Sequence, residues 1–239
     1  MPIIIREARE ADIPAMAALD VAGYRGSPFR AAMFPASRRV LPGDGDALAW
    51  FRLGAQRALA SSSSSSRYIV AVDEEEVVGM AIWGAPRPPP AGEGGGGEEK
   101  SSAGPPPGLP SYIGYEDVMQ ANAEIERMLD AQDTLDEATR TLNAIVVDEA
   151  HRRRGVGRAL VQWGIDKAAN SQPAAVWLIA TSDGKKLYES MGFGLVGSGL
   201  RCGEAQHLMY KNLESSQNRS LACKSPHQHS HMSIYNHRE

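Results

Sequence analysis

Apolar and polar residues follow two kinds of spacing along the chain, one typical of strands and the other of helices. Short runs rich in aliphatic and β-branched residues predict strands at 3–6, 67–72, 77–83, 142–147, 176–180, 193–197 and 207–211. Apolar residues three or four positions apart predict helices at 12–21, 46–60, 115–131 and 183–191, and a loop followed by a helix at 152–169. The order of these elements predicts a mixed α/β domain.

Three local features add detail to this outline. Residues 142–147 are almost all apolar, which is typical of a central strand covered on both faces. The acidic residues 73–76 separate two predicted strands and indicate a hairpin turn. Asp12 stands at the start of the first predicted helix and is a candidate N-cap.

Three segments have compositions that do not support a packed core. Residues 61–66 are all serine, residues 86–110 hold eight prolines and seven glycines, and residues 215–239 are rich in Ser, Asn and His. Such segments bury too little apolar surface to offset the entropy of ordering. We therefore predict one domain over residues 1–214, with disordered loop insertions at 61–66 and 86–110, and a disordered tail over 215–239.

The composition excludes several classes of protein. Of the 239 residues, 42% are hydrophobic, and 25 basic against 29 acidic residues give a net charge of −4. The apolar share excludes a wholly disordered chain, and the lack of a basic excess gives no support for nucleic-acid binding. No run approaches the roughly 20 apolar residues of a membrane helix. We expect a soluble cytoplasmic protein, with a nuclear location left open, that binds neither nucleic acid nor a membrane.

The cysteines and histidines indicate neither a disulfide framework nor a metal centre. Cys202 and Cys223 are too few to build such a framework. Four histidines lie in the tail without a partnering pair of cysteines, so we expect no metal site. They are His227, His229, His231 and His237.

Segment 147–160 carries the strongest chemical signal. A strand leads into a basic turn with two glycines, Gly155 and Gly157, and then into a helix. The glycines let successive N–H groups point at one spot, which is also the positive end of a helix dipole, so the turn suits a pyrophosphate. The alternative is an ordinary glycine-bearing turn with solvated arginines. The dinucleotide fingerprint is excluded, because Leu160 stands where it needs a third glycine.

Two motifs in this part of the chain resemble markers of the GNAT superfamily of N-acetyltransferases. The residues Arg-Arg-Arg-Gly-Val-Gly at 152–157 are similar to its R/Q-x-x-G-x-G/A motif. Those at 187–193, Leu-Tyr-Glu-Ser-Met-Gly-Phe, are similar to its L-Y-x-x-x-G-F motif. The resemblance covers residues 3–213 and implies the acyl-CoA N-acyltransferase fold, a mixed sheet of about six or seven strands flanked by about four helices.

The resemblance implies transfer of an acetyl group from acetyl-CoA, as co-substrate, to a primary amine. The amides of residues 154–159 would hold the cofactor's pyrophosphate, and the backbone of Val146 and Val147 would pair with its pantetheine arm like an added strand. An N–H of this stretch would polarise the thioester carbonyl. The reacting carbon would lie in a V-shaped opening between Val147 and strand 176–180. The implied cofactor-binding residues are Val146, Val147, Arg152, Arg153, Arg154, Gly155, Val156, Gly157, Arg158 and Ala159.

Tyr188 matches the tyrosine of the second motif, whose implied role is to give a proton to the departing thiolate. The alternative is an amphipathic tyrosine packed between helix and sheet. The general base is left open, because Asn143 stands where many relatives have an acid, and an amide cannot accept a proton at neutral pH. The remaining candidates are Glu124 or another acid of the preceding predicted helix, a chain of waters, or no side chain at all. Asp148 and Glu149 are close in sequence but are expected to face the turn, and His207 could reach the cleft, although a lone histidine on a strand is more often structural.

Three functions follow from these residues. The first is N-acetylation of a small amine-bearing molecule by a monomer or homodimer. The second is acetylation of a protein, at its N-terminus or at a lysine. The third is a non-catalytic acyl-CoA sensor, which the missing acid at Asn143 favours and the retained Tyr188 disfavours.

Overall fold

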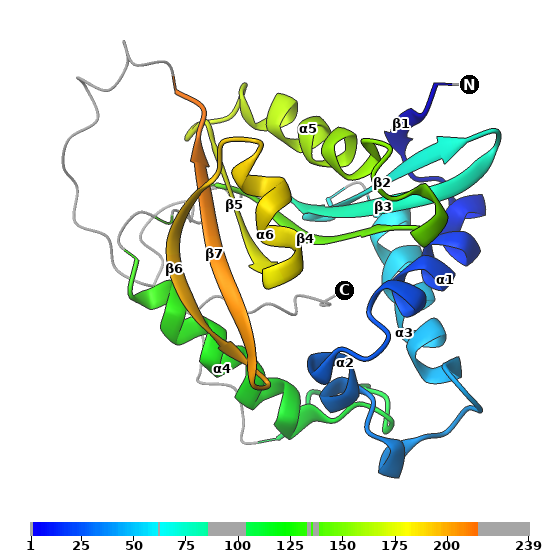
Figure 1. Cartoon of the computed structure of the whole chain (residues 1–239). Helices are drawn as coiled ribbons and strands as arrows, with labels where there is room; N and C mark the ends of the chain where they lie inside the picture. Colours follow the sequence, from blue (N-terminus) through cyan, green and yellow to red (C-terminus); the bar gives the residue numbers. More distant parts are fainter. Residues whose placement is uncertain (1, 62, 86–103, 133–134, 136–138, 215–239) are drawn as a thin grey trace.

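The computed structural model of the protein describes residues 2–61, 63–85, 104–132, 135 and 139–214. Within these residues the strands form one seven-stranded mixed sheet with the order β1-β2-β3-β4-β5-β7-β6 (Figure 1). Neighbouring strands are antiparallel except β4 and β5, which are parallel. The predicted mixed α/β fold is confirmed. The strands are β1 (Ile4–Glu7), β2 (Ser66–Asp73), β3 (Glu76–Gly84), β4 (Arg140–Val147), β5 (Ala175–Thr181), β6 (Gly194–Arg201) and β7 (Glu204–Asn212).

The α-helices cover both faces of the sheet. Helices α5 and α6 pack on one face, while α1 and α3 pack on the other face over β2, β3 and β4. Helix α4 lies on this second face over β5, β6 and β7, and α2 contacts α4. No helix in the described part of the chain is long and apolar enough to cross a bilayer. The helices are α1 (Ile13–Gly23), α2 (Pro28–Met33), α3 (Gly45–Ala60), α4 (Tyr115–Asp130), α5 (Val156–Ala168) and α6 (Ser182–Glu189).

Side chains of the central strands alternate between the two cores, as the period of a strand requires. In β2, Ile69 and Ala71 contact the α5 side, whereas Tyr68 contacts the α1 side. Gly164 of α5 lies so close to Trp83 of β3 that a Cβ there would overlap the indole ring. Helix α5 also buries a row of apolar residues about one turn apart, which are Val156, Leu160, Val161, Ile165 and Ala168.

Strands β4 and β5 pair over a short stretch and then separate. The pairs are Arg140 with Val176, Thr141 with Trp177 and Leu142 with Leu178. Beyond them β4 stays paired with β3, and β5 stays paired with β7. We call the region between residues 143–147 of β4 and 179–181 of β5 the β4–β5 opening. It corresponds to the V-shaped opening that the family resemblance implies.

A β-bulge lies where the opening begins. The register of β3 against β4 shifts between Ile82 and Trp83, which leaves Asn143 as an extra residue of β4. A bulge of this kind bends its strand and increases the local twist. The bulge therefore accounts for the divergence of β4 from β5.

Helix α2 is not predicted by the sequence pattern. It has six residues, which are too few to show a helical period. Its start carries local signals, because the Ser27 hydroxyl accepts a hydrogen bond from the Arg30 N–H at 3.4 Å and Pro28 occupies the first position. The structure thus places a short capped helix in the stretch between residues 21 and 46, where the sequence pattern predicts no element.

The serine-rich loop is shorter than its composition indicates. Strand β2 begins at Ser66, inside the segment predicted as a disordered insertion. The Ser64 carbonyl accepts a hydrogen bond from the Arg67 guanidinium at 2.9 Å. These contacts join the end of the serine run to the sheet, and Ser62 lies outside the described residues.

The other two segments predicted as disordered lie largely outside the described residues. They are residues 86–103 and 215–239. Residues 104–110, at the end of the proline-rich segment, are described, and Leu109 packs in the apolar cluster that joins α2 to α4. That end of the segment is therefore part of the folded domain.

Asp12 does not cap α1 as predicted. Its carboxylate makes no cap hydrogen bond to that helix. It accepts hydrogen bonds from the Arg9 N–H at 2.6 Å and from the Arg6 guanidinium at 2.7 and 2.9 Å. The side chain instead joins β1 to the turn that precedes α1.

Candidate active site

The turn between β4 and α5 contains two residues with left-handed backbone conformations. Strand β4 ends at Val147, a 3₁₀ turn follows at Glu149–His151, and α5 begins at Val156. Arg153 has a φ of +63° and Gly155 has a φ of +86°. Glycine adopts such a φ without the steric cost that a Cβ imposes, so Gly155 suits the position directly before the helix.

The N–H groups of this turn are available to a ligand. Among the described residues, no hydrogen bond engages the N–H of any residue from 154 to 158. The first N–H groups of a helix lack intrahelical partners because no residue precedes them by four positions inside the helix. The Ala159 N–H, by contrast, donates to the Gly155 carbonyl at 3.0 Å. The set of free amides therefore ends at Arg158, one residue earlier than predicted.

Two of the four arginines near the turn are held by the protein. Arg154 pairs with Asp73 at the end of β2, with 2.9 Å between Nη2 and Oδ2. Arg158 donates from Nη2 to the Ser190 hydroxyl at 2.9 Å and to the Ser190 carbonyl at 3.2 Å. These contacts fix the start of α5 against β2 and α6.

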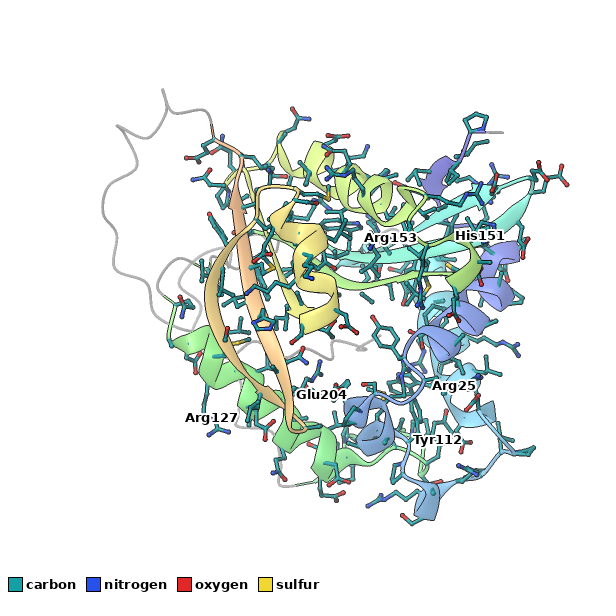
Figure 2. The ribbon with its side chains drawn as sticks, viewed as in Figure 1. Arg25, Tyr112, Arg127, His151, Arg153 and Glu204 are labelled. Atoms are coloured by element: carbon teal, nitrogen blue, oxygen red, sulfur yellow. The ribbon has the colours of Figure 1, made fainter. Side chains whose placement is uncertain are left out.

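The other two arginines, Arg152 and Arg153, lie at the start of the turn, and Figure 2 labels Arg153 near His151. Arg152 Nε donates to the Val147 carbonyl at 3.3 Å. Arg153 is exposed and makes no hydrogen bond or ion pair within the described ranges of the chain. Next to them, His151 Nδ1 lies 2.9 Å from Asp148 Oδ1, and this hydrogen bond holds the pKa of Asp148 below its usual range.

The backbone groups of β4 alternate between β3 and the β4–β5 opening. The Asp148 N–H donates to a carbonyl of β3 at 2.9 Å, and the Val146 carbonyl faces Gly79 of β3. Because successive residues of a strand point their N–H and C=O groups to opposite edges, Ile145 and Val147 direct theirs into the opening. The residues that can pair with an added strand are thus Ile145 and Val147, in place of the predicted Val146 and Val147.

Gly157 lies where the turn, the end of β4 and α6 meet. A Cβ at this position would stand 3.4 Å from Leu187 of α6 and 3.8 Å from the side chain of Val147, which are ordinary contact distances. The free amides of the turn therefore adjoin the β4–β5 opening. The structure brings together the two motifs that the sequence places about 30 residues apart.

Tyr188 projects from α6, the helix that directly follows β5. Its side chain is 5% exposed, and its ring meets that of Phe193 edge-on with 5.9 Å between the centroids. Burial raises the pKa of the hydroxyl well above its usual range, and the nearby Tyr24 adds to the rise. The hydroxyl therefore stays protonated near neutral pH, as a proton donor must. The same packing also fits the alternative of a tyrosine held between helix and sheet.

Comparison with known proteins identifies the family. The sequence profile of the Acetyltransferase (GNAT) family matches residues 39–193, well over half of the chain. The chain belongs to this family. The predicted membership is confirmed, and the mixed sheet that opens between β4 and β5 is the GNAT fold.

Two solved structures illustrate the likeness of fold. One is described as histone acetyltransferase HPA2 and related acetyltransferase from Corynebacterium glutamicum. It is 23% identical, with a TM-score of 0.58, and the match covers 89% of this chain and 97% of that one. The other is PH1933 from Pyrococcus horikoshii, which is 14% identical with a TM-score of 0.53 over 90% of this chain and 100% of that one. At these identities the likeness shows the fold alone. No curated protein matches the chain.

Asn143 and the candidate base Glu124 of this GNAT protein both make local contacts. The bulged Asn143 accepts a hydrogen bond from the Thr141 hydroxyl at 2.9 Å. Glu124 of α4 accepts one from the backbone N–H of Cys202 at 3.0 Å, so this carboxylate holds the turn between β6 and β7. Neither contact points to a role in deprotonating an amine.

His207 of β7 lies between two hydroxyl groups of this GNAT domain. Its Nε2 is 3.2 Å from the Ser182 hydroxyl, and its Nδ1 is 3.1 Å from the Ser198 hydroxyl. Both ring nitrogens are therefore used in hydrogen bonds within the protein. In the described part of the chain, no three His, Cys, Asp or Glu residues gather closely enough to hold a metal ion.

Proposed function

We propose that this protein is an acetyl-CoA-dependent N-acetyltransferase that acetylates a primary amine of a small molecule. The observation that carries the proposal is the row of unengaged N–H groups at residues 154–158, placed at the start of a helix and beside the β4–β5 opening. Such a row binds phosphate oxygens, because both the N–H groups and the helix dipole favour negative charge. Family membership supports the same reading.

The residues of the site suit the parts of acetyl-CoA in turn. The amides of residues 154–158 would bind its diphosphate, with the exposed Arg153 adding charge nearby. The backbone of Ile145 and Val147 would pair with the pantetheine arm along the edge of β4. When bound, acetyl-CoA supplies a thioester, and a neutral amine attacks its carbonyl carbon. The role of Tyr188 would be to protonate the sulfur as it leaves.

The acceptor is proposed to be a small molecule, and acetylation of a protein N-terminus or lysine is the variant. The Corynebacterium structure is described as a histone acetyltransferase and related acetyltransferase, and at 23% identity it does not indicate the acceptor of this protein. The third possibility, an acyl-CoA sensor, gains from the bulged Asn143 in place of an acid. Turnover of acetyl-CoA would distinguish the non-catalytic sensor from the small-molecule and the protein acetyltransferase.

Release of free thiol from acetyl-CoA over a panel of amines and peptides tests this proposal, with hydrolysis subtracted. We expect turnover on at least one small amine and a large loss of kcat in Tyr188→Phe, with acetyl-CoA affinity kept. The Phe variant preserves the ring and its contact with Phe193, so folding is maintained. Tight binding of acetyl-CoA without turnover on any amine or peptide would favour the sensor instead.

A further inference from the structure

The acidic hairpin between β2 and β3 is joined to the turn that follows β4. The register of β2 against β3 shifts between Ala71 and Val72, which leaves Val78 as an extra residue of β3. The carbonyl of this bulged residue accepts a hydrogen bond from the Asp148 N–H at 2.9 Å. A bulge disrupts the ladder locally and re-aims the groups beside it. The end of the hairpin therefore holds the first residue of the turn between β4 and α5.

Asp73, the last residue of β2, lies between two basic side chains of that turn. Its Oδ2 is 2.9 Å from Nη2 of Arg154 and 3.9 Å from Nε2 of His151. His151 is held on its other side, where Nδ1 lies 2.9 Å from Oδ1 of Asp148. Because an ionised carboxylate only accepts hydrogen bonds, Nδ1 is the nitrogen that donates in this pair. One carboxylate of β2 thus lies against both His151 and Arg154.

The backbone around Arg154 has an unusual conformation that other contacts must stabilise. Arg153 precedes it with a φ of +63°, and Gly155 follows it with a φ of +86°. A left-handed conformation is unfavourable for a residue that has a Cβ, as Arg153 does. The N–H of Arg154 begins the row of unengaged amides at residues 154–158. The contact of its side chain with Asp73 therefore helps to set the direction of that row.

We propose that Asp73 is a positioning residue of the diphosphate site, which holds Arg154 and thereby keeps the N–H groups of residues 154–158 in the orientation that binds phosphate oxygens. The inference rests on the proposed binding of acetyl-CoA. Asp73 itself does not contact the ligand in this assignment. Its charge is offset by the ion pair with Arg154, which limits its repulsion of a bound diphosphate.

The charge of Asp73 and its positioning role affect CoA affinity with opposite signs. A carboxylate near an anion site repels the ligand, so its charge alone predicts tighter binding when Asp73 is neutralised. The positioning role predicts weaker binding, because the ligand would then have to order the turn that Asp73 now holds in place. The Asp73 side chain is 11% exposed and that of Arg154 is 48% exposed, so the more mobile partner is the one being fixed. We therefore expect the loss of order to exceed the gain in charge.

The test is Asp73→Asn, which removes the charge and keeps the size of the side chain. We expect the affinity for CoA, measured by calorimetry, to fall about tenfold. The KM for acetyl-CoA should rise by a similar factor with kcat unchanged, as expected for a change in ligand binding alone. The kcat/KM for S-acetylpantetheine, a thioester without the diphosphate, should stay at its wild-type value. Glu75→Gln is the matched control, because it removes the same charge from an exposed position of the same hairpin, and it should leave CoA affinity unchanged.

A double-mutant cycle tests whether Asp73 acts through Arg154. In an Arg154→Ala background, Asp73→Asn should change the affinity for CoA by less than about twofold, because the partner of the carboxylate is already gone. Asp73→Glu keeps the carboxylate and should retain more affinity for CoA than Asp73→Asn does. The full tenfold loss in the Arg154→Ala background would show that Asp73 does not act through Arg154.

The remaining outcomes separate the role of Asp73 from acetyl transfer itself. Unchanged or tighter binding of CoA by Asp73→Asn would overturn the positioning role while leaving acetyl transfer intact. An equal loss with acetyl-CoA and S-acetylpantetheine would also overturn it, because the damage would not be specific to the diphosphate. A similar loss in Glu75→Gln would do the same. If the wild-type protein does not bind CoA, the proposed function fails together with the role of Asp73.

Discussion

Gly155, directly before α5, and Gly157, in its first turn, differ in what a side chain would meet there. Gly155 has a φ of +86° and open space around it, so its requirement is a backbone conformation. Gly157 has an ordinary backbone, and a Cβ there would point toward Leu187 and Val147, beside the opening. Substitutions at Gly157 therefore report on what the opening binds rather than on strain in the turn.

Gly157→Asp should abolish acetyl-CoA binding. The new carboxylate would stand among the amides of residues 154–158, and juxtaposed like charges cost several kcal/mol, so we expect affinity to fall at least about 100-fold. Gly157→Ala is the matched control, because its methyl group meets neighbours at 3.4 Å or more and adds no charge. Calorimetry with CoA measures both variants. Equal affinity in the Asp variant and the wild type would show that the diphosphate binds elsewhere.

At the scale of single residues, sequence motifs locate the turn, its two glycines and Tyr188, because these lie in contiguous stretches with their own local chemistry. They do not locate Ile145 as the opening-facing partner of Val147, since that depends on which edge of β4 faces β3.

Among the elements, the junction of β1 and α1 depends on one carboxylate. Asp12 is shared between the Arg6 guanidinium and the Arg9 N–H. The hydrogen bond to Arg6 is the main cause that lowers the pKa of Asp12, with a further contribution from the Arg9 N–H. The folded state therefore binds the ionised form more strongly than the unfolded chain does.

Asp12→Asn should lower the free energy of unfolding by about 1 kcal/mol at neutral pH. This value is below that of a fully buried charged hydrogen bond because solvent reaches Arg6. The contribution is fully present above the unfolded pKa of about 4 and is lost as pH falls through the lower folded pKa. The two proteins should therefore converge in stability in acid. Denaturant titrations at several pH values measure the difference, and a gap that stays constant into acid would contradict the assigned cause.

Most strands and helices are long enough for their period to be read from the sequence, and their order predicts the fold class. The exceptions have physical reasons. Helix α2 is too short, and its capping by Ser27 is a local signal without a period. The separation of β4 from β5 leaves no trace in the apolar pattern, because residues 142–147 look like one continuous central strand. It follows from the bulge at Asn143, which depends on the register with β3.

The whole molecule consists of two half-sheets joined over a short contact. One half contains β1 to β4 and the other contains β5 to β7, and three residue pairs connect them. Helix α5 packs across β1 to β5 and so bridges the two halves. A ligand placed in the opening would add contacts to both halves.

Binding of CoA should therefore protect the turn and stabilise the whole domain. At a ligand concentration of 100 times Kd, the free energy of unfolding should rise by about 2.7 kcal/mol. Hydrogen–deuterium exchange should slow at the amides of residues 154–158 and of Ile145 and Val147. Gly157→Asp serves as the control and should show neither effect. Protection confined to other elements would place the ligand outside the opening.

The short contact between β4 and β5 also determines how the domain would respond to tension on its two ends. Strand β1 lies in one half and β7 in the other, so a stretching force passes from half to half (Figure 1). The force would be carried by three residue pairs and by the side-chain packing of α5, while every other strand junction is longer. Mechanical rupture would thus start at these three pairs, next to the opening where the thioester is proposed to bind, and a bound ligand would help to hold the two halves together.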